Sequence, residues 1–184
     1  MQKFILTYCI FFFITTQAMA LEIAGVQVPE TISTDLQLNG AGIRSKFFFK
    51  IYIAELYLQH PAKTAAEILG SNDRKRMTMH ILYNEVSKEK LVNGWNDGFE
   101  ANLSTEQLKQ LSPQITQFNS LFVNVHEGEE IILDYKVGSG TTVTIAGIKK
   151  GVIRGADFNR ALLSIWIGRE PVTEGLRDEL LGKN

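Results

Sequence analysis

Residues 38–58 read LNGAGIRSKFFFKIYIAELYL, and this stretch decides the fold that the sequence predicts. The aromatic and β-branched run from Phe47 to Leu58 is typical of a strand. Its apolar residues would fall on both faces of that strand, so we expect both faces to be covered. The sequence NGAG at 39–42 indicates a turn or a bulge. Arg44 follows it, and its charge must be solvated, paired or used to bind an anion, because an unpaired buried charge is too costly.

The segments around this stretch predict an α+β fold. Ser87 is expected to cap one helix, Ser104 and Gln107 to form a capping box for the next, and Pro113 to divide that second helix. Further strands are predicted at 21–29, 76–84, 129–137, 141–148 and 152–155, with a turn at 149–151, and helices at 62–69, 87–103, 104–122, 157–168 and 173–181. Because strands and helices come in blocks without strand–helix–strand alternation, we expect an antiparallel sheet with helices on one face.

The N-terminus has the three parts of a secretory signal peptide. Lys3 supplies the positive start, residues 4–14 are an apolar core, and Ala18-Met19-Ala20 is a cleavage site. We therefore predict a signal peptide at 1–20, cleaved after Ala20, and a single domain at 21–184. A signal anchor is the alternative, but the apolar core is shorter than the ~20 residues that span a bilayer.

The cysteine content points to the compartment. The single cysteine, Cys9, lies inside the predicted signal peptide. The mature chain would therefore have neither a disulfide nor a cysteine-ligated zinc site. An exported chain without disulfides favours a periplasmic location in a bacterium.

Charge and composition exclude several classes of partner. The 19 Lys and Arg side chains nearly balance the 20 Asp and Glu side chains and form no extended basic patch. Neither nucleic-acid binding nor binding to an anionic membrane therefore has electrostatic support. The densest basic stretch, residues 74–76, is expected to be the solvated start of a strand. The three histidines lack metal-ligand spacing, so no metal or other cofactor is predicted. No segment after residue 20 is long and apolar enough to span a membrane.

Three stretches of the chain together resemble the chalcone isomerase fold family, specifically its bacterial chalcone-isomerase-like branch. They are LNGAGIR at 38–44, KIYIAELYL at 50–58 and NRALLSIWIGREPVTEGLRDELLG at 159–182. None is a signature by itself, and the ordered combination carries the resemblance. It implies an open-faced β-sandwich, in which a large antiparallel sheet and a layer of helices enclose an apolar cleft.

The family that the chain resembles contains isomerases, which close a flavanone ring, and fatty-acid binders, which grip a carboxylate with an arginine and a tyrosine. Arg44 matches the family arginine. Tyr52 stands where the isomerases have threonine and the fatty-acid binders have tyrosine. Asn93 matches a helix asparagine, Val86 stands where the isomerases have their catalytic tyrosine, and Ser164 falls at or beside an active-site threonine.

Arg44 and Tyr52 can share a ligand only if the chain turns between them. Seven residues separate them, and an extended chain would place them about 26 Å apart. A hairpin near Ser45-Lys46 would bring them together. Otherwise Arg44 would pair with an acid such as Glu55, and the Tyr52 hydroxyl would bond to a backbone carbonyl. Asn93 lies opposite the apolar stripe of its predicted helix, which favours a position facing water.

The altered hydroxyl positions favour binding over catalysis, because water-orienting groups supply much of the barrier lowering in such an isomerase. The leading hypothesis is an exported, non-catalytic protein that binds a small apolar or amphipathic anion, most plausibly a fatty carboxylate. One alternative is an intramolecular lyase acting on an unsaturated phenolic or enone. A second is an accessory protein that binds envelope components. The candidate ligand-binding residues are Arg44, Tyr52, Asn93 and Ser164.

Overall fold

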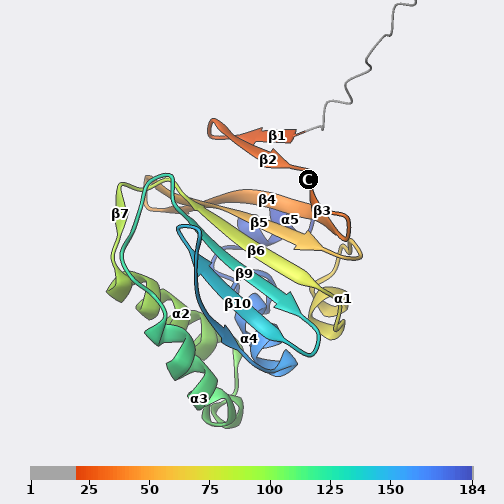
Figure 1. Cartoon of the computed structure of the whole chain (residues 1–184), viewed down its shortest axis with the longest axis vertical. Coiled ribbons are helices and arrows are strands. Elements are labelled where there is room, and N and C mark those ends of the chain that lie inside the picture. Colours follow the sequence, from red (N-terminus) through yellow and green to blue (C-terminus); the bar gives the residue numbers. More distant parts are fainter. Residues whose placement is uncertain (1–19, 184) are drawn as a thin grey trace, which may run out of the picture.

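The computed structural model describes residues 20–183 and contains a seven-stranded antiparallel sheet with helices packed behind it (Figure 1). The predicted signal peptide lies outside the described residues except for Ala20, which begins the first strand. The elements in order are β1 Ala20–Ile23, β2 Val26–Pro29, β3 Thr31–Ser33, β4 Leu36–Lys46, β5 Phe49–Leu58, α1 Ala65–Gly70, β6 Lys75–Ile81, β7 Glu85–Val86, α2 Lys88–Asn102, α3 Thr105–Ser120, β8 Val125–His126, β9 Glu130–Lys136, β10 Gly140–Ile145, β11 Ile148–Ile153, α4 Ala156–Ile167 and α5 Glu174–Leu180.

The large sheet has the strand order β11-β10-β9-β6-β5-β4-β3, so β11 and β3 are its edges. Every pairing in it is antiparallel. The pairs β1–β2 and β7–β8 form two small separate sheets. The predicted α+β class, with a large antiparallel sheet and a layer of helices, is confirmed.

Strand β5 lies inside the sheet, between β6 and β4, as its composition predicts. From Tyr52 to Leu58 every residue is buried. Tyr52, Ala54, Leu56 and Leu58 belong to the core beneath the helices. Ile53, Glu55 and Tyr57 point to the other face and are also buried, where the Tyr57 hydroxyl reaches the Pro29 carbonyl oxygen at 3.0 Å. Both faces of this part of the strand are therefore covered.

The first part of the aromatic run was predicted wrongly. Phe47 and Phe48 form the two-residue loop between β4 and β5 rather than part of a strand, and Phe47, Phe48 and Phe49 are 86%, 100% and 57% exposed. The loop has a positive φ at Phe47 (55°) and not at Phe48, which is the pattern of a type II′ turn. Sequence reasoning missed the turn because that position normally takes glycine.

The NGAG sequence forms no turn. Strand β4 runs straight through it, with a register shift between Leu38 and Gly40 that marks the bulge. A Cβ atom at Gly40 would lie 2.1 Å from the Glu179 carbonyl oxygen, and one at Gly42 would lie 1.7 Å from Glu179 Oε2. The glycines are needed because α5 packs directly on β4.

The helices bury a continuous aromatic cluster. The capping box of Ser104 and Gln107 is present at the start of α3, and Ser87 caps α2. The aromatic rings come from α2, α3 and its C-terminal end, and α4: Trp95, Phe99, Phe118, Phe122, Phe158 and Trp166. Pro113 does not divide α3, contrary to prediction. Burial of this stripe and the capping box together offset the roughly 3 kcal/mol that an interior proline costs a helix.

Two tight turns and one cap also differ from prediction. The segment 21–29, predicted as one strand, is a hairpin with positive φ at Ala24 and Gly25. The turn before β11 has the same pattern and lies at Ala146-Gly147. Residues 149–151, predicted as a turn, therefore belong to β11. Alanine is an uncommon first residue for a type I′ turn, which explains why the signal was missed. The N-cap of α4 is Gly155, and Asp157, where the helix was predicted to begin, lies inside the first turn.

The basic stretch 74–76 is not a solvated start of a strand. Arg74 donates to Asp35 (2.8 Å) and to Asp134 (2.9 Å), and Arg76 also bonds to Asp134. Lys75 is only 3% exposed. The acids that pair with these residues lie 39 and 60 positions away from Arg74, so the local sequence could not reveal them.

Candidate functional site

A cavity of about 590 Å³ opens between the helices and the end of the sheet that carries the β4–β5 loop. This volume lies within the range of about 300–1,000 Å³ that is typical of small-molecule sites. Its wall comes from β4 to β7 and from α2, with one residue of α4 and one residue before α5. Most of the wall is apolar or aromatic: Phe47, Phe49, Ile51, Met79, Ile81, Tyr83, Val86, Leu91, Trp95, Ile165 and Val172.

Arg44 and Tyr52 meet in this wall. They are direct partners in the β4–β5 ladder, so their side chains leave the same face of the sheet. A hairpin between the two was the condition for a shared ligand, and the turn at Phe47-Phe48 provides it. The predicted alternative, an Arg44–Glu55 pair, is wrong, because Glu55 lies opposite Ala41 and receives a hydrogen bond from Tyr57.

Arg44 is partly buried without an acid to neutralise it. Its Nη1 donates to the Ser45 carbonyl oxygen. Within residues 20–183, no carboxylate forms an ion pair with its guanidinium. The remaining N–H groups of Arg44 are therefore free to bind an anion in the cavity.

The Tyr52 hydroxyl is a neutral hydrogen-bond donor whose proton is unused. It accepts a hydrogen bond from Trp166 Nε1 at 3.0 Å, and among the described residues it donates to no acceptor, including the backbone carbonyl considered above. Burial raises the pKa of Tyr52 to about 12, although the Trp166 hydrogen bond and the charge of Arg44 partly oppose this. The group therefore keeps its proton at physiological pH and can donate it to a ligand.

Trp95 adds a third donor, from a residue whose helical spacing predicts a core position by default and allows a place in the cleft wall. Its side chain lines the cavity and is 4% exposed, and its Nε1 has no hydrogen-bond partner within 20–183. A buried N–H group without a partner costs free energy, so an acceptor on a ligand would stabilise it. The helical spacing of Trp95 gives no sign of this.

Asn93 and Ser164 are placed very differently. Asn93 is exposed, as its position opposite the apolar stripe predicts, and it belongs to the cavity rim. Ser164 is buried in α4, where its Oγ donates to the Ala161 carbonyl oxygen at 2.6 Å. Ser164 is not among the residues that line the cavity. The structure thus brings Arg44, Tyr52 and Asn93 to one cavity and leaves Ser164 outside it.

The rim of the cavity carries charges of both signs. Lys46 and Lys90 lie on it, as do Glu85 and Asp97. Val86, at the position of the isomerase tyrosine in the family resemblance, lines the wall with an apolar side chain. The interior of the cavity therefore combines donors for an anion with an apolar surface.

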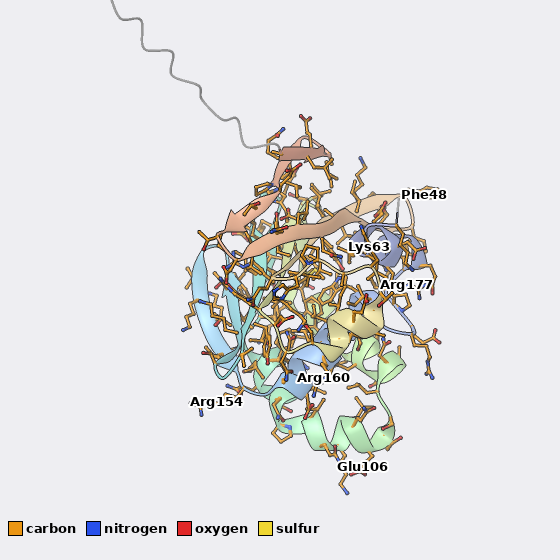
Figure 2. All side chains as sticks on the ribbon, turned by 90° about the vertical axis from the view of Figure 1, so that its right-hand side faces the viewer. Phe48, Lys63, Glu106, Arg154, Arg160 and Arg177 are labelled. Atoms are coloured by element: carbon orange, nitrogen blue, oxygen red, sulfur yellow. The ribbon has the colours of Figure 1, made fainter. Side chains whose placement is uncertain are left out.

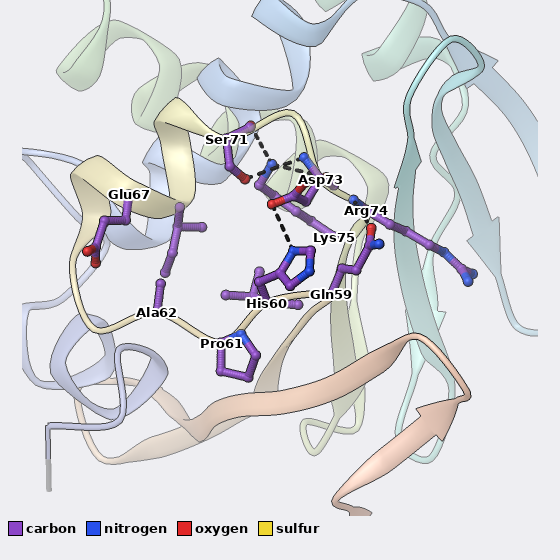
Figure 3. Close-up of a pocket in the computed structure, with 11 residues that line it drawn as sticks. Gln59, His60, Pro61, Ala62, Glu67, Ser71, Asp73, Arg74 and Lys75 are labelled. Atoms are coloured by element: carbon purple, nitrogen blue, oxygen red, sulfur yellow. Dashed lines mark hydrogen bonds and ion pairs between the residues drawn. The ribbon is translucent and has the colours of Figure 1, made fainter.

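A second cavity, of about 220 Å³, lies at the other end of β5 (Figure 3). Several of its polar groups are paired with one another, and Arg74 is paired with Asp35 and Asp134. Lys75 Nζ donates to the carbonyl oxygens of Ser71 (2.7 Å) and Asp73 (3.1 Å), and His60 Nδ1 lies 3.2 Å from Asp73 Oδ2. Burial lowers the pKa of Lys75. These contacts hold the connection from α1 to β6 in place, and we assign this cavity a structural role.

Comparison with known proteins agrees with this architecture. The crystal structure of a fatty-acid binding protein from Arabidopsis thaliana matches with a TM-score of 0.68 and 18% sequence identity, over 91% of this chain and 97% of that chain. At this identity the likeness establishes the fold. No curated protein matches the sequence. A family model described as chalcone isomerase-like matches residues 20–182. The chain therefore belongs to the chalcone isomerase-like family.

Proposed function

We propose that this protein binds a small apolar carboxylate of the fatty-acid type in the cavity beside Arg44 and Tyr52, without chemical change to the ligand. One observation carries the proposal. The Arg44 guanidinium has no carboxylate partner among residues 20–183, the Tyr52 O–H group has no acceptor there, and both belong to the wall of the same apolar cavity. The Arabidopsis protein of similar fold is described as fatty-acid binding, which supports the same ligand class.

The head group and the tail of such a ligand would contribute in different ways. A hydrogen bond from a charged group to a carboxylate contributes about 1.5–3 kcal/mol. Each methylene that leaves water contributes about 0.8 kcal/mol. Affinity should therefore rise about fourfold per added methylene until the cavity is full. A carboxylate oxygen could also accept the Trp95 Nε1–H, for which residues 20–183 provide no acceptor.

We also propose that the protein is exported, that it works in the periplasm, and that it belongs to the bacterial branch of the family. The support is the three-part pattern at 1–20 and the absence of cysteine from 21–184. Mass spectrometry of the protein from a periplasmic extract tests this. The expected mass is that of a chain that begins at Leu21. An unprocessed chain in the cytoplasmic fraction would contradict the proposal.

Titration calorimetry with straight-chain carboxylic acids of increasing length tests the binding site. Arg44→Ala should weaken binding by roughly 10- to 100-fold. Arg154→Ala, at an exposed arginine at the end of the molecule away from the Phe48 loop (Figure 2), is the matched control and should bind as the wild type does. Alcohols of the same length should bind more weakly than the acids. Equal affinity for acid and alcohol, or an unchanged affinity in Arg44→Ala, would refute the proposal.

The isomerase alternative makes a separate prediction. The same two donors could steady an oxyanion, but Val86 offers no hydroxyl at the position of the isomerase tyrosine. We expect no turnover of enone substrates by the wild type. Turnover that disappears in Arg44→Ala would replace the binding proposal with an enzymatic one. Failure of every acid and enone to bind would favour an accessory protein.

A further inference from the structure

The loop between β4 and β5 leaves three phenylalanines in water. Phe48 is fully exposed, Phe47 is 86% exposed and Phe49 is 57% exposed. Figure 2 shows Phe48 at the far end of the hairpin, pointing away from the body of the molecule. Residues 46–50 form the hairpin tip. No other point of the described chain gathers three exposed aromatic side chains.

The hairpin tip protrudes beyond its neighbouring strand. Tyr52 pairs with Ile81, the last residue of β6, and the amides of Leu82 and Tyr83 still bond to the Ile51 carbonyl. From Ile51 to Phe48 the β4–β5 hairpin then continues for about 10 Å with no strand on the β6 side of β5. The tip is therefore a narrow projection with little flat area.

Turn stability does not account for the aromatic residues. Phe47 has a φ of 55°, a conformation that glycine adopts freely and a bulky side chain adopts at a cost. A Gly-Ser loop would suit this turn better. Exposed aromatic groups held in an unfavourable backbone conformation point to a function for their side chains.

The charged residues of the hairpin are all positive. They are Arg44, Lys46 and Lys50 in the stretch from Leu36 to Ala54, and Lys46 and Lys50 are exposed. The overall charge balance of the chain gives no support for binding to an anionic membrane, but the fold gathers these cations at one protruding end. The rim acids, Glu85 and Asp97, belong to β7 and α2 rather than to the hairpin.

We propose that the hairpin tip inserts into the interface of a lipid bilayer. The three phenylalanine rings would lie at the boundary of head groups and acyl chains, and Lys46 and Lys50 would contact lipid phosphates. A bilayer accepts a narrow projection without a matching shape, whereas a stable protein interface needs about 800 Å² on each partner.

Docking would also place the cavity against the bilayer, because Lys46, Phe47 and Phe49 belong to the cavity wall. An apolar ligand could then pass between membrane and cavity without crossing water. This second step rests on the proposed binding function. The docking step does not, because it depends only on the exposed tip.

Flotation with vesicles of phosphatidylglycerol and phosphatidylethanolamine, without added fatty acid, tests the docking. The full chain is expressed, and the protein is purified after any processing by the host. The N-terminus of each purified variant is determined, so that only proteins with the same N-terminus are compared. The double variant Phe47→Gly/Phe48→Ser should lower the partition constant roughly tenfold for each phenylalanine. Lys46→Gln and Lys50→Gln should each lower it roughly fivefold. Val137→Ser, at an exposed valine after β9 at the opposite end of the sheet, should leave it unchanged.

Phe48→Trp provides a direct reporter of insertion. Trp95 and Trp166 are buried, so a blue shift of the emission on adding vesicles reports the new side chain. The proposal is overturned if this emission does not shift, or if Phe47→Gly/Phe48→Ser floats as well as the wild type. It is also overturned if sedimentation shows that the wild type is a dimer and Phe47→Gly/Phe48→Ser a monomer, while neither protein binds vesicles. The tip would then join two copies of the chain. Phe48 is not among the residues that line the cavity, so loss of docking in Phe48→Ser with fatty-acid binding intact would support the docking and leave the proposed function standing.

Discussion

Glu55 lies in the middle of the sheet, and its ionisation should reduce the stability of the fold. The side chain is 5% exposed. Burial raises the pKa of Glu55 from 4.5 to about 7, opposed by the hydrogen bond from Tyr57 and reinforced by the charge of Glu130. The Tyr57 hydroxyl lies 3.0 Å from both Glu55 Oε2 and the Pro29 carbonyl oxygen. Because the hydroxyl has one proton, both contacts are hydrogen bonds only when a protonated Glu55 donates to the Tyr57 oxygen and Tyr57 donates to the Pro29 carbonyl.

The pKa difference sets the size and the sign of the effect. Between pH 4.5 and 7 the folded state keeps a proton on Glu55 that the unfolded chain has lost, so stability falls as the pH rises. One pKa unit corresponds to about 1.4 kcal/mol, so the loss from pH 4.5 to above pH 7 is about 3 kcal/mol. The acidic side of this window is the stable side.

Glu55→Gln keeps the size of the side chain and an N–H group that can donate to the Tyr57 oxygen, but it cannot ionise. At pH 8 the variant should be more stable than the wild type by up to about 3 kcal/mol, a rise in Tm of roughly 6–12 °C for a domain of this size. At pH 4 the two should be nearly equal. Urea unfolding followed by circular dichroism from pH 4 to 8 measures the difference.

Subtracting the unfolding free energy of the wild type from that of Glu55→Gln at each pH removes the contributions of the titratable groups that the two proteins share. Glu100→Gln, at an exposed glutamate of α2, is the matched control and should track the wild type at every pH. A gap between Glu55→Gln and the wild type that stays constant with pH would show that Glu55 ionises normally in the fold. A variant less stable than the wild type at pH 8 would refute the reasoning altogether.

Two further predictions concern packing around the site. Gly40→Ala would place a Cβ 2.1 Å from the Glu179 carbonyl oxygen and should lower the free energy of unfolding in urea by about 2–3 kcal/mol. Gly70→Ala is the control, because a Cβ there meets nothing within 4 Å. Equal stabilities of the two variants would contradict the close contact at Gly40. Tyr52→Phe leaves the Trp166 N–H without its acceptor and should cost about 1–3 kcal/mol. Tyr52→Phe/Trp166→Phe should lose less stability than the two single variants lose together, and additive losses in the double-mutant cycle would argue against the bond.

The sequence predicts the sheet and helices well where local patterns decide them. The aromatic and β-branched run places β5, and the Ser104–Gln107 box marks the start of α3. Prediction from the sequence fails where contacts between segments far apart in the chain decide the local structure. Gly40 reads as a turn signal because its neighbour α5 lies some 140 residues away along the chain. Phe47 reads as a strand residue because nothing local shows that it occupies a position suited to glycine.

The candidate site was predicted in part. The resemblance indicates Arg44 and Tyr52, and the hairpin brings them opposite each other. Ser164 shares that resemblance, yet α4 directs its hydroxyl to the Ala161 carbonyl. Trp95 could not be identified from its spacing, because an aromatic residue on a buried helix face looks the same with or without a partner for its N–H group.

The open form of the large sheet has a consequence for solubility. An unpaired strand edge can template the addition of strands from other molecules. Edge strand β3 is only three residues long. At the opposite edge, β11 carries Lys149 and Lys150 and pairs with β10 with a register shift. The Val152 carbonyl oxygen of β11 accepts a hydrogen bond from Gln117 Nε2 of α3 at 3.4 Å. Short length, charge and an occupied acceptor all oppose β-aggregation, so the sheet can stay open without closing into a barrel.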